Sequence, residues 1–357
     1  MRIEHVTKKF ADVTAVNDVS LDIFQGEFFS LLGSSGCGKS TLLRMLAGLE
    51  RPTQGRIYID GADMTDLPPY SRPVNMMFQS YALFPHMTVE QNVEFGLKQD
   101  CLPRRERAER VREMLDLLQI GALRRRTPDQ ISGGQRQRVA LARTLAKHPK
   151  LLLLDEPLGA LDKRLRESAQ FELVNLQERL GLTFITVTHD QEEAMTMSTR
   201  IAVMNAGQIL QVDTPTAIYE YPEYRFVADF IGLVNLFEGR VAETLDDQVL
   251  VETSMGRRLH MRCAHPHAVG TPVTVAIRPE KVQLCQGYRE DGTNQVKGVV
   301  EDIAYLGDVS IYRVRVSPET LVEMTLTNVQ PRTEQVLTWG QEVAMEWSPT
   351  SGVVLTE

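Results

Sequence analysis

Long hydrophobic segments are absent from this 357-residue sequence. No uninterrupted apolar run approaches the ~20 residues that a helix needs to span a bilayer. The opening residues, Met1-Arg2-Ile3-Glu4, do not form the basic and apolar pattern of a signal peptide. These absences argue against a helical integral membrane protein and against a secreted one. We therefore expect a chain that stays in the cytoplasm and touches a membrane only through a partner.

Cysteine is scarce as well, with four residues in the chain: Cys37, Cys101, Cys263 and Cys285. None forms a CxxC pair, so we expect free thiols in a reducing compartment rather than disulfides. Cys263 lies close to His265 and His267, but three ligands on alternate residues without a fourth are a weak zinc pattern. We interpret this segment as a surface loop.

A positive net charge is also missing, because 39 Lys and Arg residues face 47 Asp and Glu residues and leave a net charge of −8. Such a chain has no overall attraction to nucleic acid or to anionic lipid. The arginine clusters at 104–105 and 124–126 are short, and we interpret them as solvated helix faces. A hydrophobic fraction of 43% is typical of a globular protein, and the length favours two domains.

The pattern of the sequence changes near residue 235. Before this point, apolar runs alternate with helical patterns, which predicts an α/β domain over residues 1–235. After it, short runs with every second residue apolar, such as Val273, Val275 and Ile277, predict half-buried strands. We expect a small all-β barrel or sandwich over residues 236–357. Of the two domains, the first contains the glycine-rich phosphate loop.

Residues 33–40 read Gly-Ser-Ser-Gly-Cys-Gly-Lys-Ser and fit the phosphate-binding pattern G-x-x-x-x-G-K-[S/T]. An apolar run at 28–32 precedes this loop and a helical pattern follows it, as the motif requires. Glycines let main-chain N–H groups curl around a phosphate, and the helix adds its dipole. We expect Lys39 to reach the β- and γ-phosphates of ATP, Ser40 to ligate Mg²⁺ and Thr41 to bond an α-phosphate oxygen. The predicted cradle comprises Gly33, Ser34, Ser35, Gly36, Cys37, Gly38, Lys39, Ser40 and Thr41, with Cys37 contributing its backbone only.

Two acidic residues follow the apolar run at 151–154, which we expect to be a central strand buried on both faces. Asp155 suits Mg²⁺, usually through water, and Glu156 can act as general base on the attacking water. A second strand-like run at 183–188 delivers His189 at its carboxyl end, where ligands gather in open α/β sheets. His189 is expected to hydrogen-bond the γ-phosphate and hold the water. The sequence therefore predicts a site that hydrolyses ATP.

Ser132-Gly133-Gly134-Gln135 begins a helical pattern, and Ser132 is expected to be the N-cap of this helix. The string resembles the signature motif of the ATP-binding-cassette (ABC) ATPases, and the resemblance extends over residues 3–235. It implies an α/β P-loop NTPase domain with a helical subdomain, in which Gln79 is the Q-loop residue, residues 158–162 are the D-loop and His189 is the switch histidine. In that family, the signature of one subunit closes over the ATP of another. The resemblance therefore implies a head-to-tail homodimer.

Further positions follow from the same resemblance. Phe10 matches the aromatic residue that stacks on adenine, with a phenylalanine of the strand core as the alternative. Val16 matches a contact to the edge of the base. Gln79 can sense Mg²⁺ or water on one side and a permease-contacting segment on the other. Two positions depart from the family pattern: Ile131 replaces the usual leucine, and Gly159 replaces the commoner D-loop serine, which weakens the expected D-loop contact to the opposite subunit.

Two strings of the second domain, residues 276–282 and 303–308, resemble the transport-associated OB-type (TOBE) regulatory domain of solute-importer ATPases. Among the importers, residues 75–92 and 190–197 are most similar to the ATPases of polyamine (putrescine/spermidine) uptake. Sugar and ferric-iron importer ATPases share most of these strings and remain the alternative. The resemblance implies two transmembrane permease subunits, contacted around residues 81–87, a periplasmic solute-binding protein, and a peripheral position at the cytoplasmic face of the inner membrane.

Two other classes of protein are alternatives to an importer ATPase. A soluble ABC protein acting on DNA or ribosomes would show a basic face, a second cassette or a coiled-coil insertion, and the sequence has none of these. A scaffold that binds ATP without hydrolysis would not need Glu156 and His189, which are both present. We therefore expect an ATPase without a nucleic acid partner.

Overall fold

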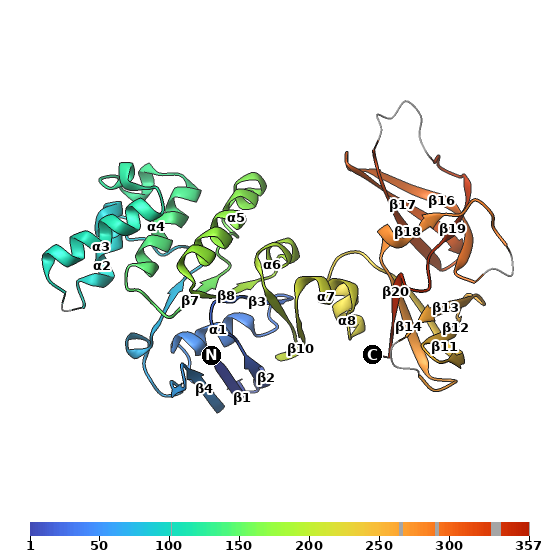
Figure 1. Cartoon of the computed structure of the whole chain (residues 1–357), viewed down its shortest axis with the longest axis horizontal. Helices are drawn as coiled ribbons and strands as arrows, with labels where there is room; N and C mark the ends of the chain where they lie inside the picture. Colours follow the sequence, from blue (N-terminus) through green and yellow to red (C-terminus); the bar gives the residue numbers. More distant parts are fainter. Residues whose placement is uncertain (101, 264–266, 290–292, 330–336, 357) are drawn as a thin grey trace. The chain divides into compact units, whose positions relative to one another are not determined.

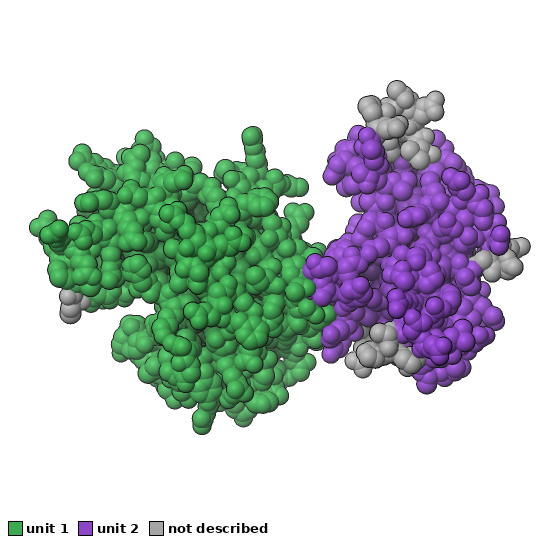
Figure 2. Space-filling model, viewed as in Figure 1, with its two compact units in different colours: residues 1–215 green, residues 216–357 purple. Residues whose placement is uncertain are grey.

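The computed structural model describes residues 1–100, 102–263, 267–289, 293–329 and 337–356. The chain forms two compact units, residues 1–215 and residues 216–357 (Figure 2). The units divide between residues 215 and 216. This division lies earlier in the chain than the domain boundary near residue 235 that the sequence pattern predicts. Two short helices, α7 (Pro215–Glu220) and α8 (Arg225–Phe230), therefore fall in the second unit, apart from the first residue of α7.

A six-stranded sheet forms the centre of the first unit (Figure 1). Its strands lie in the order β10 (Gln208–Asp213), β9 (Arg200–Asn205), β3 (Phe28–Gly33), β8 (Thr183–Thr188), β7 (Leu151–Asp155) and β6 (Val74–Met77). All neighbouring pairs are parallel except β9 and β10. The four leucines of β7 are buried, which confirms the prediction of a central strand covered on both faces.

One face of the central sheet is covered by the helix that follows the phosphate loop. This helix, α1 (Lys39–Ala47), buries Leu42, Leu43, Met45 and Leu46. The same core contains apolar residues of a second, antiparallel sheet with the order β2 (Val13–Asp22), β1 (Arg2–Phe10), β4 (Gln54–Ile59) and β5 (Ala62–Asp63). The phosphate loop is therefore anchored at both ends by buried structure.

The other face of the central sheet shares a core with a group of helices, seen at the upper left of Figure 1. They are α2 (Val89–Leu97), α3 (Arg104–Leu117), α4 (Gly133–Leu145) and α5 (Lys163–Leu180). A shorter helix, α6 (Gln191–Met197), follows β8. This arrangement confirms an α/β domain with a helical subdomain. Within the described residues, no helix combines the length and the apolar character needed to cross a membrane.

The second unit confirms the expected all-β domain. One antiparallel sheet has the order β13 (Arg258–Arg262), β12 (Gln248–Thr253), β11 (Asn235–Leu245), β14 (Pro272–Ile277) and β20 (Gly352–Leu355). The other has the order β15 (Gln283–Leu284), β19 (Glu342–Glu346), β16 (Gln295–Tyr305), β17 (Val309–Ser317) and β18 (Thr320–Thr327). Apolar residues of both sheets form one core.

The strand β14 differs from the sequence prediction. The alternation of Val273, Val275 and Ile277 predicts one buried face, but all residues of β14 after Pro272 are buried. The second face is covered because Ala276 packs against Ala228 of α8. A helix that the sequence pattern groups with the first domain therefore completes the core of the second unit.

Arg278, directly after β14, fixes this helical segment to the second unit. Its side chain is buried and donates hydrogen bonds to the carbonyl oxygens of Ala228, Leu233 and Tyr219 at 3.0, 3.1 and 3.3 Å. The guanidinium also lies 4.3 Å from the centre of the Tyr219 ring. The arginine of the string at 276–282 thus binds main-chain carbonyl groups of α7, of α8 and of the segment that follows α8.

Three of the four cysteines lie in the described part of the chain, and no disulfide is formed there by Cys37, Cys263 or Cys285. Cys101 and His265 lie outside the described residues. The interpretation of residues 263–267 as a surface loop therefore stays a prediction. Among the described residues, no group of three or more His, Cys, Asp or Glu side chains is arranged to hold a metal ion by itself.

Candidate functional site

The predicted catalytic residues meet at one edge of the central sheet. Parallel strands end at the same edge of a sheet, so the segments that follow neighbouring strands lie close together. The strand order β3-β8-β7-β6 brings four such segments side by side. They are the phosphate loop after β3, His189 after β8, Asp155 and Glu156 at the end of β7, and Gln79 after β6.

Two glycines of the phosphate loop are required by close backbone neighbours. A Cβ atom on Gly33 would lie 2.2 Å from the carbonyl oxygen of Met204, and one on Gly38 would lie 2.2 Å from that of Ala15. Gly36 and Gly38 have φ angles of 81° and 108°, which favour glycine. The sequence motif explains these glycines by access to phosphate, and the structure adds a second reason, the packing of the loop against distant strands.

Lys39 is the first residue of α1 and is 6% exposed. Its Nζ atom donates hydrogen bonds of 2.8 Å to the carbonyl oxygens of Gly33 and Ser34, so the ammonium group lies across its own loop. Cys37 is buried and its Sγ atom lies 3.6 Å from this Nζ. Gly33 is also buried, and Gly38 and Thr41 are half-buried, whereas an exposed rim is formed by Ser34, Ser35, Gly36 and Ser40.

Ser40 and Asp155 supply the oxygens expected for Mg²⁺. The Ser40 hydroxyl donates to Asp155 Oδ1 over 3.4 Å, which joins the start of α1 to the end of β7. Burial, followed by the neighbouring Glu156 carboxylate, raises the pKa of the Asp155 carboxyl above its ordinary value. A bound cation would oppose both effects, because it would stabilise the charged form of the Asp155 carboxyl.

Glu156 forms hydrogen bonds with the two other catalytic candidates, Gln79 and His189, one through each of its carboxylate oxygens. Gln79 Nε2 donates to Oε2 at 2.6 Å, and His189 Nδ1 lies 2.8 Å from Oε1. The backbone of Glu156 has a φ of 45°, a left-handed conformation that costs free energy for a residue with a Cβ. Its N–H donates to the carbonyl oxygen of Val187 at 3.0 Å, which holds this conformation against β8.

The signature residues form the start of α4. Ser132 is the N-cap, as predicted: its Oγ accepts from the N–H of Gln135 at 3.3 Å, and Gln135 Oε1 accepts from the N–H of Ser132 at 3.0 Å. Gly133 and Gly134 form the first turn, and a Cβ on Gly134 would meet no atom within 4 Å. The helix start therefore offers open space beside its N–H groups, which suits an anion.

The adenine candidates differ in their surroundings. Phe10 is 43% exposed on β1 and Lys8 Nζ lies 4.7 Å from its ring centre, so the alternative of a buried core phenylalanine is wrong. Val16 is fully buried in the core of α1 and the antiparallel sheet. This gives Val16 a packing role, and its contact to the base edge stays a prediction. Val13, paired with Phe10 and 65% exposed, is an apolar neighbour that the sequence reasoning missed.

Arg143 is another residue that the motifs do not reveal. Tyr81 and Ala82, which follow the Q-loop residue, have left-handed φ angles of 61° and 46°. Arg143 of α4 donates to both of their carbonyl oxygens, at 2.8 and 2.7 Å. It thereby ties the strained segment after Gln79 to the helix that carries the signature residues.

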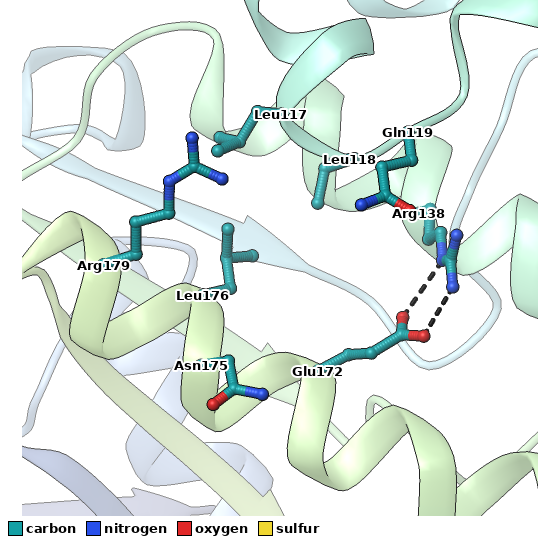
Figure 3. A pocket seen from close by; sticks show the side chains of 8 residues that line it. All are labelled: Leu117, Leu118, Gln119, Arg138, Glu172, Asn175, Leu176 and Arg179. Atoms are coloured by element: carbon teal, nitrogen blue, oxygen red, sulfur yellow. Dashed lines mark hydrogen bonds and ion pairs between the residues drawn. The ribbon is translucent and has the colours of Figure 1, made fainter.

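A cavity of about 230 Å³ lies apart from these residues, between α3, α4 and α5 (Figure 3). Three leucines line it together with polar side chains, and a two-bond ion pair from Arg138 to Glu172 crosses one side. Arg138 belongs to α4 and Glu172 to α5, so the ion pair links the helical subdomain to a helix that covers the central sheet. None of the predicted site residues lines this cavity.

Comparison with known proteins identifies both parts of the chain. Residues 16–159 match the family model "ABC transporter", and residues 275–355 match "TOBE domain". The chain is 53% identical over 357 residues to the putrescine transport ATP-binding protein PotG of Escherichia coli, covering 100% of this chain and 95% of that protein. It is 48% identical to the spermidine/putrescine import ATP-binding protein PotA of Rubrobacter xylanophilus, covering 99% and 93%.

A solved structure agrees with the fold of the first unit. The dimeric ATP-binding cassette MJ0796, in a post-hydrolysis state bound to ADP and Pi, is 34% identical with a TM-score of 0.53, covering 60% of this chain and 98% of that one. These matches confirm the resemblance carried by the signature, and they confirm the OB-type second domain. The chain therefore belongs to the ABC transporter family and is one of its ATPases.

Proposed function

We propose that this chain is the ATP-hydrolysing subunit of an importer of polyamines, of the putrescine and spermidine type. The relatives that support this solute match the chain over both units, including the second domain that a bare cassette lacks. A sugar or ferric-iron importer is the alternative that the sequence left open. The proposal includes a homodimer, two membrane permease subunits, a periplasmic solute-binding protein and a peripheral position at the cytoplasmic face of the inner membrane.

The phosphate loop holds the nucleotide in this proposal. Loop N–H groups and Lys39 bind the β- and γ-phosphates, and Thr41 bonds the α-phosphate. Oxygens of Ser40, Asp155 and Gln79 are hard ligands that fit Mg²⁺, which neutralises phosphate charge when it is bound. Phe10 stacks on the adenine from its exposed position on β1.

Glu156 is the proposed general base, and its two hydrogen bonds carry the proposal. With one oxygen held by Gln79 and the other by His189, the carboxylate is fixed at the end of β7. A base must be positioned as well as basic, since proton transfer requires hydrogen-bond geometry to the water. Gln79 further connects this carboxylate to residues 81–87, the proposed permease contact.

Ser132, Gly133, Gly134 and Gln135 complete the site of a second subunit. The space beside Gly134 in the first turn of α4 is open, and an anion from outside the subunit can occupy it. A neighbour in structure is a dimeric cassette bound to ADP and Pi, which supports a dimer, and the resemblance of the signature supports its head-to-tail arrangement.

Glu156→Gln tests the chemistry. The variant keeps the size of the side chain but removes the base, so we expect turnover to fall by ~10²–10⁴-fold while ATP binding is retained. Glu167→Gln is the matched control, because Glu167 is an exposed residue of α5. Steady-state phosphate release measures the first quantity, and titration with a fluorescent ATP analogue measures the second. Turnover of Glu156→Gln equal to that of the control would show that the assignment is wrong.

The solute is tested in cells. A strain that lacks this gene is complemented with the wild-type chain or with Glu156→Gln, and uptake of radiolabelled putrescine is measured. We expect uptake with the wild-type chain, loss of uptake with the variant, and competition by unlabelled spermidine. Uptake of a sugar or of ferric iron that follows the gene, with no effect on putrescine, would establish the alternative.

A further inference from the structure

Arg166 lies in the first turns of α5, directly after the D-loop, and connects two catalytic segments. Its Nη2 atom donates to the carbonyl oxygen of Leu161 at 3.2 Å, within the D-loop. Its Nη1 atom donates to Asp190 Oδ2 at 2.8 Å, directly after His189. Its Nε atom lies 3.7 Å from Glu193 Oε1, close enough for an ion pair. The guanidinium of Arg166 therefore contacts three segments: the D-loop, the turn that follows β8, and α6.

Glu193 holds the same turn through hydrogen bonds. Glu193 is 2% exposed, and its Oε2 atom accepts a hydrogen bond of 2.8 Å from the Thr188 hydroxyl. That hydroxyl accepts in turn from the N–H of Asp190 at 2.9 Å. Asp190 Oδ1 accepts from the N–H of Glu193 at 3.2 Å. The residues on both sides of His189 are thus fixed by side chains, whereas His189 itself stays free to face Glu156.

This network is costly if it only stabilises the fold. Burial, with the nearby Asp190 carboxylate, raises the pKa of the Glu193 carboxyl above its ordinary value, and the Thr188 hydrogen bond and the charge of Arg166 oppose this only in part. Removing a carboxylate such as that of Glu193 from water often costs as much free energy as its attraction to a partner returns, so this contact adds little to stability. Arg166 Nε is buried and has no hydrogen-bond partner among the described residues. A role in positioning explains why polar groups occupy this place.

We propose that Arg166 is a positioning residue for ATP hydrolysis, which fixes the turn bearing His189 against the D-loop residue Leu161. This inference rests on the proposed role of His189 beside Glu156. In this role Arg166 acts through the residues that it contacts, Leu161, Asp190 and Glu193, rather than on the nucleotide itself. It sets the direction from which His189 Nδ1 meets Glu156, through the Asp190 carboxylate on one side and the D-loop carbonyl on the other.

The first test compares Arg166→Met with Arg164→Met in the full-length chain. Arg164 is an exposed residue of the same helix and provides the matched control. Because a displacement of about 1 Å at a catalytic group can lower the rate by ~10²-fold, we expect kcat of Arg166→Met to fall by 10- to 100-fold. The KM for ATP should stay within about twofold of the control, because the phosphate loop is not touched. A kcat equal to the control, or a loss confined to KM, would overturn the proposal.

A second variant, Asp190→Asn, tests the proposal if Arg166→Met does not fold. Asp190→Asn keeps an N-cap for α6, because asparagine caps helices as well as aspartate does. This variant removes the charge that binds the Arg166 guanidinium, which weakens one charge-assisted hydrogen bond. We therefore expect kcat to fall by 3- to 10-fold, while the melting temperature stays unchanged. A wild-type kcat in this variant would contradict a positioning role.

A double-mutant cycle separates this inference from the proposed function. His189→Ala by itself tests the role of His189, and a normal kcat there would refute the function proposed for that residue. If His189 is required and Arg166 acts through it, adding Arg166→Met to His189→Ala should lower the single-turnover rate by less than about twofold. An equal loss in both backgrounds would show that Arg166 acts by another route, and the positioning proposal would then fail by itself.

Discussion

Replacing Arg278 with methionine tests whether the segment before residue 235 is part of the second unit. Methionine preserves the length and packing of the stem but donates no hydrogen bond. The carbonyl oxygens of Ala228, Leu233 and Tyr219 would each lose a buried or partly buried donor. The contact of the guanidinium with the Tyr219 ring would be lost as well.

The size of the effect follows from these contacts. Each carbonyl left without a partner costs about 1 kcal/mol or more, and the aromatic contact adds up to about 1 kcal/mol. Burial lowers the pKa of Arg278, and removing this buried charge recovers part of the loss. We therefore expect a net destabilisation of about 3 kcal/mol, which lowers the melting temperature of a unit of this size by about 10 °C.

Differential scanning calorimetry of the full-length chain measures this effect, with Arg258→Met as the control. Arg258 is an exposed residue of β13 in the same unit. We expect the transition of the second unit to shift in Arg278→Met alone, while binding of a fluorescent ATP analogue stays at the wild-type level. A shift no larger than that of the control would refute the reasoning about the three carbonyl groups.

The remaining predictions concern the phosphate loop, the signature and the domain boundary. Lys39→Ala should abolish binding of a fluorescent ATP analogue, because Lys39 provides the main positive charge of the loop; unchanged affinity would refute this. Mixing Lys39→Ala with Ser132→Arg, both in a Glu156→Gln background, should restore ATP-dependent dimers that neither protein forms alone; dimers of the Ser132→Arg protein by itself would contradict a head-to-tail site. Deleting residues 216–357 should leave a soluble unit that binds ATP, whereas deleting 236–357 should leave an aggregation-prone segment, because α8 would lose its apolar partner; equal solubility of the two proteins would argue against this division.

The local features of the site could be predicted from the sequence because their signals are local. The loop at 33–40 determines its own strand–loop–helix context, and the Ser132 hydroxyl caps α4 by accepting from an N–H three residues away. The leucines before Asp155 show a strand covered on both faces. In each case, the residues that determine the structure are neighbours in the chain.

Features that depend on distant neighbours could not be predicted in this way. Gly33 and Gly38 must be glycine because carbonyl groups of Met204 and Ala15 approach them, and neither approach is visible in the motif. The change from helical to strand patterns near residue 235 does not reveal that α8 packs on β14, since helices occur in both units. Arg143 likewise gains its importance from the distant carbonyl groups of Tyr81 and Ala82, and Arg166 from the carboxylate of Asp190.

The contacts within the site also indicate why hydrolysis should depend on a second subunit. Lys39 donates to two carbonyl groups of its own loop, Glu156 is held by Gln79 and His189, and the Ser132 hydroxyl is engaged in its own helix cap. Binding ATP replaces these hydrogen bonds rather than adding to them, so each exchange returns less free energy than an entirely new contact does. Donors that the fold leaves without a partner contribute more, and the N–H groups of Gly133 and Gly134, which have no acceptor among the described residues, are of this kind. They can reach a γ-phosphate only from another subunit if the head-to-tail arrangement holds, and closure of the dimer then supplies the interaction that a single chain lacks.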